Sequence, residues 1–147
     1  MISIDQIKQL REETGVSPVE IKKALAEANG DLEKAKELLR IWGKKIADKK
    51  VAKSATQGIV DFYIHPNLKT GVLLDIRCET DFVVNSPEFK NLAHELALQV
   101  ASMDPESSED LLSQEYIRDN SMTVEQLIKS AVGKLVENIQ VGRFERI

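Results

Sequence analysis

The sequence predicts an α+β fold in which a small helical bundle precedes a three-stranded antiparallel sheet covered by two or three helices. Up to residue 43 the apolar residues recur at helical spacing, whereas from Gly58 they alternate with a period of two. The charge changes sign nearby, with 12 basic and 9 acidic side chains in residues 1–57 but 8 and 15 in residues 58–147. We therefore expect a three-helix domain over residues 1–43, a basic helical linker over residues 44–57 and an α+β core over residues 58–147.

The first two expected helices have clear local signals. Ile4, Ile7 and Leu10 lie on one face of the first, which is expected to end at Thr14-Gly15. The second starts at Ser17-Pro18-Val19-Glu20, where a capping serine, a proline at the first helical position and a glutamate suit a capping box. Its buried stripe is expected to be Ile21, Ala24, Leu25 and Ala28.

A third helix and a connector come next. Asn29-Gly30 suits a left-handed helix end and Asp31 can cap the next helix, whose stripe is Leu32, Ala35, Leu38, Leu39 and Trp42. Beyond it, five lysines surround a few apolar residues: Lys44, Lys45, Lys49, Lys50 and Lys53. This connector is either an ordinary solvated helix or an electrostatic arm that touches a partner or ribosomal RNA, and charge alone leaves both open.

Two half-buried strands are predicted after Gly58. Val60, Phe62 and Ile64 alternate with Ile59, Asp61 and Tyr63, and Val72, Leu74, Ile76 and Cys78 alternate with Leu73, Asp75, Arg77 and Glu79. The turn residues 66–71 between them favour an antiparallel hairpin. Cys78 is expected on the inner face as a buried structural thiol, whereas Ile59, Tyr63 and Leu73 are expected on the outer face. Apolar residues exposed there indicate a contact with a partner or a second copy.

The remaining core elements are two helices and a last strand. Ser86-Pro87 starts a helix with the apolar stripe Phe89, Leu92, Ala93, Leu96, Ala97 and Val100, which leaves His94 exposed. Residues 103–121 are less regular. Thr123 and Gln126 form a capping box at the start of a second helix. The tail alternates as a strand only if Gly142 forms a bulge.

Composition narrows the class of protein. With 42% hydrophobic and 30% charged residues and no apolar run near the ~18 residues of a membrane span, we expect no membrane insertion. The segment from Ile2 to Asp5 lacks the features of a secretory or transit signal, and the single Cys78 favours a reducing cytoplasm. The net charge of −4 argues against direct nucleic-acid binding.

Enzyme chemistry finds little support in the sequence. It contains no glycine-rich phosphate loop, no cysteine and histidine cluster, and no nucleophile with a base at a recognised spacing. Asp75, Glu79 and Asp81 are three acids within seven residues, which leaves a small metal-dependent hydrolase as a rival, but a charged strand end is the commoner explanation. We therefore expect a protein that acts by binding and needs no cofactor.

Several short segments of the sequence resemble the elongation factor Ts family. In the N-terminal part they are Leu10-Arg11-Glu12-Glu13-Thr14-Gly15, Lys22-Lys23-Ala24-Leu25 and Glu27-Ala28-Asn29-Gly30-Asp31, which resemble that family's ubiquitin-associated-like (UBA-like) domain. In the core they are Gly71-Val72-Leu73-Leu74, Cys78-Glu79-Thr80-Asp81-Phe82-Val83 and Glu137-Asn138-Ile139. The chain departs from the family at Ser17, Pro18 and Val19 and again at Val136 and Gly142. It resembles a short form that lacks the second core subdomain and the coiled-coil insertion.

The resemblance implies a guanine-nucleotide exchange factor for elongation factor Tu in translation elongation. By resemblance, Thr80, Asp81, Phe82 and Val83 enter the partner near its Mg²⁺ and phosphate site, with Phe82 as a wedge and Asp81 as a polar contact. The N-terminal bundle would dock through Arg11, Thr14, Gly15 and Val16. The exposed face of the sheet or the C-terminal helix would contact another domain of the partner or a second copy of this chain, as a homodimer. An adaptor that binds ubiquitin-like proteins remains the alternative, although it leaves Thr80 to Val83 unexplained.

Overall fold

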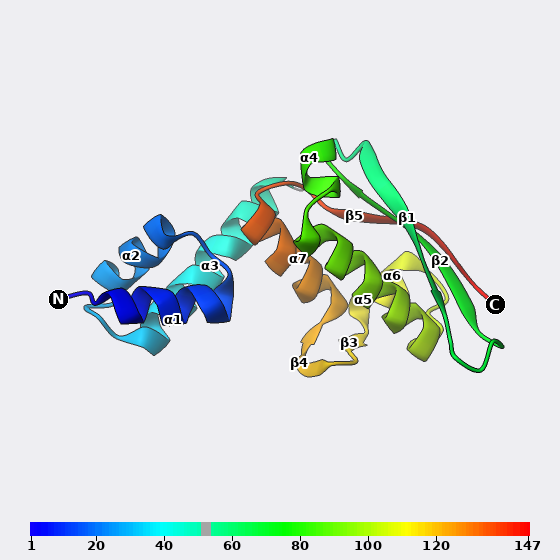
Figure 1. Ribbon diagram of the computed structural model, residues 1–147, viewed down its shortest axis with the longest axis horizontal. Coiled ribbons are helices and arrows are strands. Elements are labelled where there is room, and N and C mark those ends of the chain that lie inside the picture. Colours follow the sequence, from blue (N-terminus) through cyan, green and yellow to red (C-terminus); the bar gives the residue numbers. More distant parts are fainter. Residues whose placement is uncertain (51–53) are drawn as a thin grey trace.

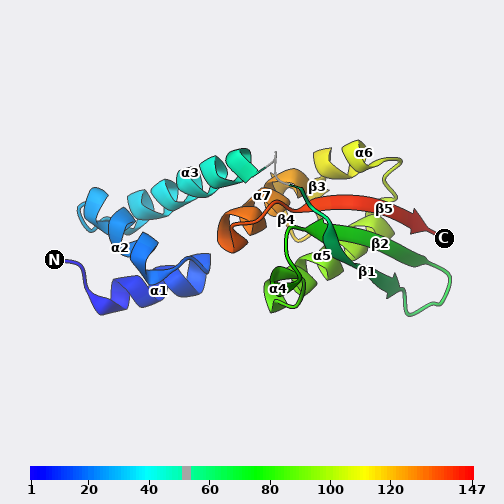
Figure 2. The ribbon, with the colours of Figure 1, turned by 90° about the horizontal axis from the view of Figure 1, so that it is seen from above.

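The computed structural model describes residues 1–50 and 54–147, without the side chains of residues 49 and 50 (Figure 1). Three helices lie at one end of an elongated molecule and a β-sheet lies at the other, where the chain ends (Figures 1 and 2). This arrangement agrees with the predicted α+β class. The predicted linker residue Lys53 and the side chains of Lys49 and Lys50 lie outside the described part.

The N-terminal helices are α1 (Ile4–Thr14), α2 (Pro18–Glu27) and α3 (Leu32–Lys50). Their ends agree with the local signals: Gly15 adopts a left-handed conformation after α1, Asn29 and Gly30 do so after α2, and Asp31 accepts a hydrogen bond from the Lys34 amide. Ser17 caps α2 by accepting from the Glu20 amide, which is one of the two bonds of the predicted capping box. A full capping box of Ser3 and Gln6, which was not predicted from the sequence, starts α1. Ile4 of the first predicted stripe is exposed, whereas Ile7, Leu32, Leu38 and Trp42 are partly buried against the other stripe residues. These form one apolar cluster of seven buried residues: Leu10, Ile21, Ala24, Leu25, Ala28, Ala35 and Leu39.

The core contains a three-stranded antiparallel sheet in the order β1 (Gln57–Ile64), β2 (Gly71–Cys78) and β5 (Gln140–Arg146). In the pairing of β2 with β5, Leu74 lies opposite Phe144 and Ile76 lies opposite Val141, so β5 carries one extra residue between them. The predicted bulge at Gly142 is therefore confirmed. A side chain at Gly142 would require the Asp75 carboxylate to shift, so the bulge is tightest at this glycine.

The prediction of which residues of β1 face the core is wrong. Ile59 pairs with Ile76 and Tyr63 with Val72, so Ile59 and Tyr63 lie on the inner face and pack against the core. The exposed apolar residues, called the open sheet face below, are Val60, Phe62, Ile64 and Leu73. Of the three residues expected outside, only Leu73 is there, but the expectation of an exposed apolar sheet surface holds.

Helices cover the inner face of the sheet. Helix α5 (Pro87–Met103) packs on β1 and β2, and α7 (Val124–Leu135) packs on α5, as Figure 1 shows. In the sequence, α5 is followed by α6 (Ser108–Ser113) and a hairpin of β3 (Glu115–Tyr116) and β4 (Asp119–Thr123), and α7 comes after them. Helix α6 and this hairpin were not predicted from the sequence. The buried Gln99 of α5 holds this hairpin, because its amide donates to the Glu115 carbonyl (3.0 Å) and accepts from the Ile117 amide (3.0 Å).

Helix α3 joins the two ends of the molecule. It runs on past Trp42 into the predicted helical linker, which is helical as far as Lys50, and packs along α7, where Gly43 and Gly133 let the two backbones approach closely. A Cβ atom at Gly133 would stand 3.0 Å from the Gly43 Cα atom. Ala47, further along α3, is buried in the apolar cluster of the core. The N-terminal helices are thus attached to the core by direct helix packing as well as by the chain.

None of the helices in the described residues is both long enough and apolar enough to span a membrane.

Candidate functional site

The segment that carries the predicted site residues is a one-turn helix, α4 (Asp81–Val84), between β2 and α5. Thr80 is its N-cap: the backbone is extended there and the Thr80 hydroxyl accepts a hydrogen bond from the Val83 amide (3.4 Å). Ser86 then caps α5 by accepting from the Phe89 amide (3.2 Å), and its hydroxyl donates to the Val83 carbonyl (2.7 Å). Two caps within seven residues give this segment a defined shape.

The four predicted residues of this segment face different surroundings. The Phe82 side chain is 83% exposed and Asp81 is also exposed, whereas Val83 is only 4% exposed and belongs to the core cluster. The Thr80 hydroxyl is engaged in the cap and in a bond to Glu137. Asp81 and Phe82 are therefore the members that a partner can reach with side chains, while Val83 anchors the turn.

The carboxylate of Glu137 holds the start of this segment. Glu137 lies just after α7, and its Oε1 atom accepts from the backbone amides of Glu79 (3.1 Å) and Thr80 (2.9 Å). Its Oε2 atom accepts from the Thr80 hydroxyl (2.6 Å). In the sequence, Glu137 belongs to a segment that resembles the elongation factor Ts family. No local pattern indicates that it contacts Glu79 and Thr80, because these residues are far from it in the chain.

Cys78 lies directly beneath the segment. It is fully buried, as expected, and its thiol donates to the Thr80 carbonyl (3.2 Å). Burial raises the pKa of the Cys78 thiol, and the negative charge of Glu137 adds to this effect. The thiol is thus held in its neutral form, which fits a structural residue better than a nucleophile.

The N-terminal site candidates lie at the end of α1 and in the turn after it. Arg11 is exposed, Val16 packs against the N-terminal cluster, and the Thr14 hydroxyl donates to the Leu10 carbonyl (2.5 Å) while accepting from the Val16 amide (3.3 Å). Gly15 has a φ of 67°, a conformation that other residues adopt only at a cost. Arg11 therefore offers an exposed side chain, whereas Gly15 offers backbone.

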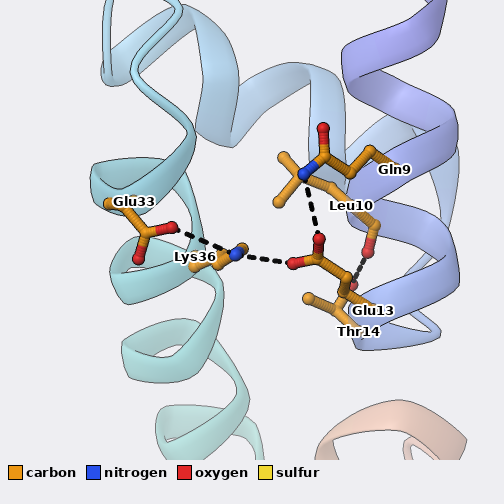
Figure 3. A network of polar contacts seen from close by, with 6 residues as sticks. All are labelled: Gln9, Leu10, Glu13, Thr14, Glu33 and Lys36. Carbon is orange, nitrogen blue, oxygen red and sulfur yellow. Dashed lines mark hydrogen bonds and ion pairs between the residues drawn. The ribbon is translucent and has the colours of Figure 1, made fainter.

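An ion-pair network fixes the end of α1 against α3 (Figure 3). The Lys36 ammonium contacts Glu13 (2.6 Å) and Glu33 (3.1 Å), and the Gln9 amide donates to Glu13 (3.0 Å). The hydrogen bond from Lys36 lowers the pKa of the Glu13 carboxyl. The turn at Gly15 is therefore held on both sides, by α1 itself and by α3.

The structure brings the two predicted regions to one cleft. Its volume is about 730 Å³, and it lies between the turn after α1, the segment around α4 and the end of α7. Its lining residues are Gly15, Asp81, Phe82, Asn85, Ser86, Pro87, Glu88, Lys134 and Leu135. The aliphatic part of Lys134 lies against Gly15. Arg11, Thr14 and Val16 are not among the lining residues.

The acids of the rival hydrolase hypothesis do not form a metal site. Asp75 pairs with Arg77 (3.0 Å) on the outer side of the sheet, and Glu79 accepts a hydrogen bond from the Asn138 amide (3.1 Å). Within residues 1–50 and 54–147, no three acidic, histidine or cysteine side chains are grouped to hold a metal ion. The described structure therefore gives this hypothesis no support.

Comparison with known proteins agrees with the resemblance found in the sequence. A family model described as "Elongation factor TS" matches residues 79–147. Elongation factor Ts of Coprothermobacter proteolyticus is 40% identical over 99% of this chain and 96% of the relative, and that of a Thermoanaerobacter species is 39% identical over 99% and 94%. The Nostoc protein of the same name is 46% identical over 97% of this chain but 45% of its own length.

The first two alignments also support a short form. They run over 190 and 191 positions, more than the 147 residues of this chain, so the relatives contain residues within the aligned span that have no counterpart here. Near-complete coverage at this level of identity establishes the relationship. The chain belongs to the elongation factor Ts family of translation elongation factors.

Proposed function

We propose that this chain is a cytoplasmic guanine-nucleotide exchange factor for elongation factor Tu, and that it promotes GDP release by inserting the Thr80–Val83 segment near the Mg²⁺ and phosphate site of the GTPase. The observation that carries the proposal is the exposure of Phe82, whose side chain is presented to solvent from a short helix held at both ends. A large apolar side chain on a fixed base can enter a partner without first losing conformational freedom.

Such a factor works through differential binding and makes no covalent bond. A GTPase holds GDP through backbone amides at the phosphates and through Mg²⁺, and GDP leaves quickly once these contacts are weakened. A factor that binds the nucleotide-free state more tightly than the GDP-bound state lowers the affinity for GDP by the same ratio. One buried phenylalanine contributes about 2–4 kcal/mol as an interface hot spot, which is a ratio of about 30 to 1,000.

The residues of the segment have separate roles in this proposal. Phe82 is the wedge that displaces the part of the GTPase that positions Mg²⁺. Asp81, exposed beside it, supplies polar contacts that fix the approach. Thr80 and Val83 hold the turn, the first through its hydroxyl and the second through the core.

The N-terminal turn completes the docking surface. Gly15 lines the same cleft as Asp81 and Phe82, so one partner element seated there contacts both ends of the molecule. Arg11 is exposed nearby and adds a cationic contact, while Thr14 and Val16 keep the turn in shape. We place this contact on the same nucleotide-binding domain of elongation factor Tu.

The experiment is a nucleotide-release measurement. Elongation factor Tu is loaded with fluorescent GDP and chased with unlabelled GDP, with and without this chain at micromolar concentration. The proposal expects release to accelerate and then saturate as the chain is added, and expects excess GDP to weaken the complex of the two proteins. An unchanged release rate at every concentration would contradict the proposed function.

A further inference from the structure

We infer that Glu137 is a positioning residue for the exchange segment: through Thr80 it sets the place from which Asp81 and Phe82 are presented. The kinetic part of this inference rests on the proposed function. Glu137 lies outside the cleft lining, so its effect on a partner has to pass through the segment it holds. Three successive contacts, described in turn below, connect Glu137 to Phe82.

The first link is the turn that delivers Glu137. Helix α7 ends at Leu135, and Val136 then adopts a left-handed conformation with φ of 58°. A β-branched residue is strained in this region, so the turn needs support from neighbouring contacts. The contact of Glu137 with the end of β2 supplies that support.

The second link is a reciprocal pair of carboxylates, called the Glu79–Glu137 brace below. Glu137 accepts from the amides of Glu79 and Thr80, and Glu79 accepts from the amide of Asn138 (3.1 Å). Each carboxylate thus binds backbone at the start of the other segment. Hydrogen bonds to charged acceptors are stronger than neutral ones, and two that cross between the same segments fix both their distance and their direction.

The third link is the Thr80 hydroxyl. It donates to Glu137 and accepts from the Val83 amide, so the group that caps α4 is itself oriented by Glu137. Phe82 lies between Thr80 and Val83 in this single turn. Loss of the carboxylate leaves the hydroxyl free to rotate away, and a helix of one turn has little else to define it.

The test separates a positioning role from a general loss of stability. Four proteins are compared in the GDP-release assay: the natural chain, Glu137→Ala, Phe82→Ala and the double variant. If Glu137 acts through Phe82, we expect Glu137→Ala to lower the saturating release rate on the order of tenfold in the natural background, but less than about twofold when Phe82 is already alanine. Equal losses in both backgrounds would overturn the inference.

Two further variants sharpen the test. Glu137→Gln keeps an oxygen for the two amides but changes the partner of the Thr80 hydroxyl, so its loss is expected to be smaller than that of Glu137→Ala. The control is Glu109→Ala, which removes an exposed carboxylate of α6 and is expected to release GDP at the natural rate. A Glu137→Gln variant slower than Glu137→Ala would contradict the inference, because glutamine keeps the acceptor for the two amides that alanine loses.

Hydrogen exchange in the free protein gives a readout that does not depend on any partner. The amides of Glu79 and Thr80 are expected to exchange about tenfold faster or more in Glu137→Ala, while the buried strand amides keep their protection. Unchanged exchange at both amides would refute the brace. If Phe82→Ala alone leaves GDP release unchanged, the proposed wedge fails, and the exchange measurement still decides on the brace.

Discussion

Two phenylalanines are exposed at opposite kinds of surface. Phe82 is 83% exposed on a one-turn helix, with the polar Asp81 beside it and the Glu79–Glu137 brace behind it. Phe62 is 63% exposed in the middle of the open sheet face, flanked by Val60, Ile64 and Leu73. Exposure alone therefore does not identify a wedge. A single projecting aromatic suits insertion into a partner, whereas a flat apolar surface suits burial against another flat surface.

The largest expected effect comes from the anchor beneath Phe82. Val83→Asp places a charge in the core cluster, so we expect the free energy of unfolding to fall by about 3 kcal/mol or more. The neighbouring change Phe82→Asp is the matched control and is expected to stay within about 0.5 kcal/mol because that side chain is in solvent. Urea unfolding of both variants measures the difference, and equal losses would show that the two residues are not placed as described.

The open sheet face predicts self-association. We expect light scattering to give the mass of a homodimer, because apolar residues of two copies can cover one another and this chain lacks residues that its relatives have. Phe62→Asp is expected to yield the monomer mass, since it puts a charge at the centre of the surface, while Phe82→Asp leaves the dimer intact. A monomer mass for the natural chain at tens of micromolar would contradict the expectation that the open sheet face, unlike the surface around Phe82, mediates self-association.

The buried thiol of Cys78 predicts that the stability of the folded chain depends on pH. Its pKa is raised in the folded chain, so the folded state holds the proton more tightly and stability falls as the pH rises above the unfolded value of about 8.5. Between about pH 8.5 and 10, before tyrosines titrate, this loss is expected in the natural chain and absent in Cys78→Ala. Denaturant unfolding over that range measures it, and an identical slope in both proteins would contradict the assignment.

The smallest expected effect is a gain. Val136→Gly relieves the left-handed valine before Glu137, and because that side chain is half exposed little packing is lost. We expect the variant to be more stable by up to about 1 kcal/mol, with the Glu79–Glu137 brace unchanged. Thermal unfolding is the measurement. A clear loss of stability would mean that Val136 makes contacts worth more than its strain.

Signals within a few residues were enough to predict much of this structure. Ser86-Pro87, the Thr123 and Gln126 capping box, and the left-handed Gly15 all mark element ends through their own chemistry. The bulge at Gly142 was predictable because the alternation of the last strand breaks there. The segment around Phe82 was predicted as a site from its resemblance to the elongation factor Ts family, and its own residues did not establish that Phe82 is exposed.

Features that depend on distant partners were not predictable. Both faces of the first strand carry apolar residues, so only the pairing of Ile59 with Ile76 and Tyr63 with Val72 decides which face is buried. A helical linker after Gly43 was predicted, but its packing on α7 through Gly43 and Gly133 was not. Nor was the contact of the Glu137 carboxylate with Thr80 across 57 residues of chain. None of these contacts leaves a periodic or capping signal in the sequence.

The central claim is that Phe82, and not an exposed aromatic in general, drives GDP release. Its direct test is the saturating rate of fluorescent GDP release from elongation factor Tu with the natural chain, Phe82→Ala and Phe62→Ala at matched concentrations. We predict that Phe82→Ala lowers the acceleration by about 30-fold or more and that Phe62→Ala stays within about threefold of the natural chain. An unchanged rate with Phe82→Ala, or an equal loss with both variants, would contradict it.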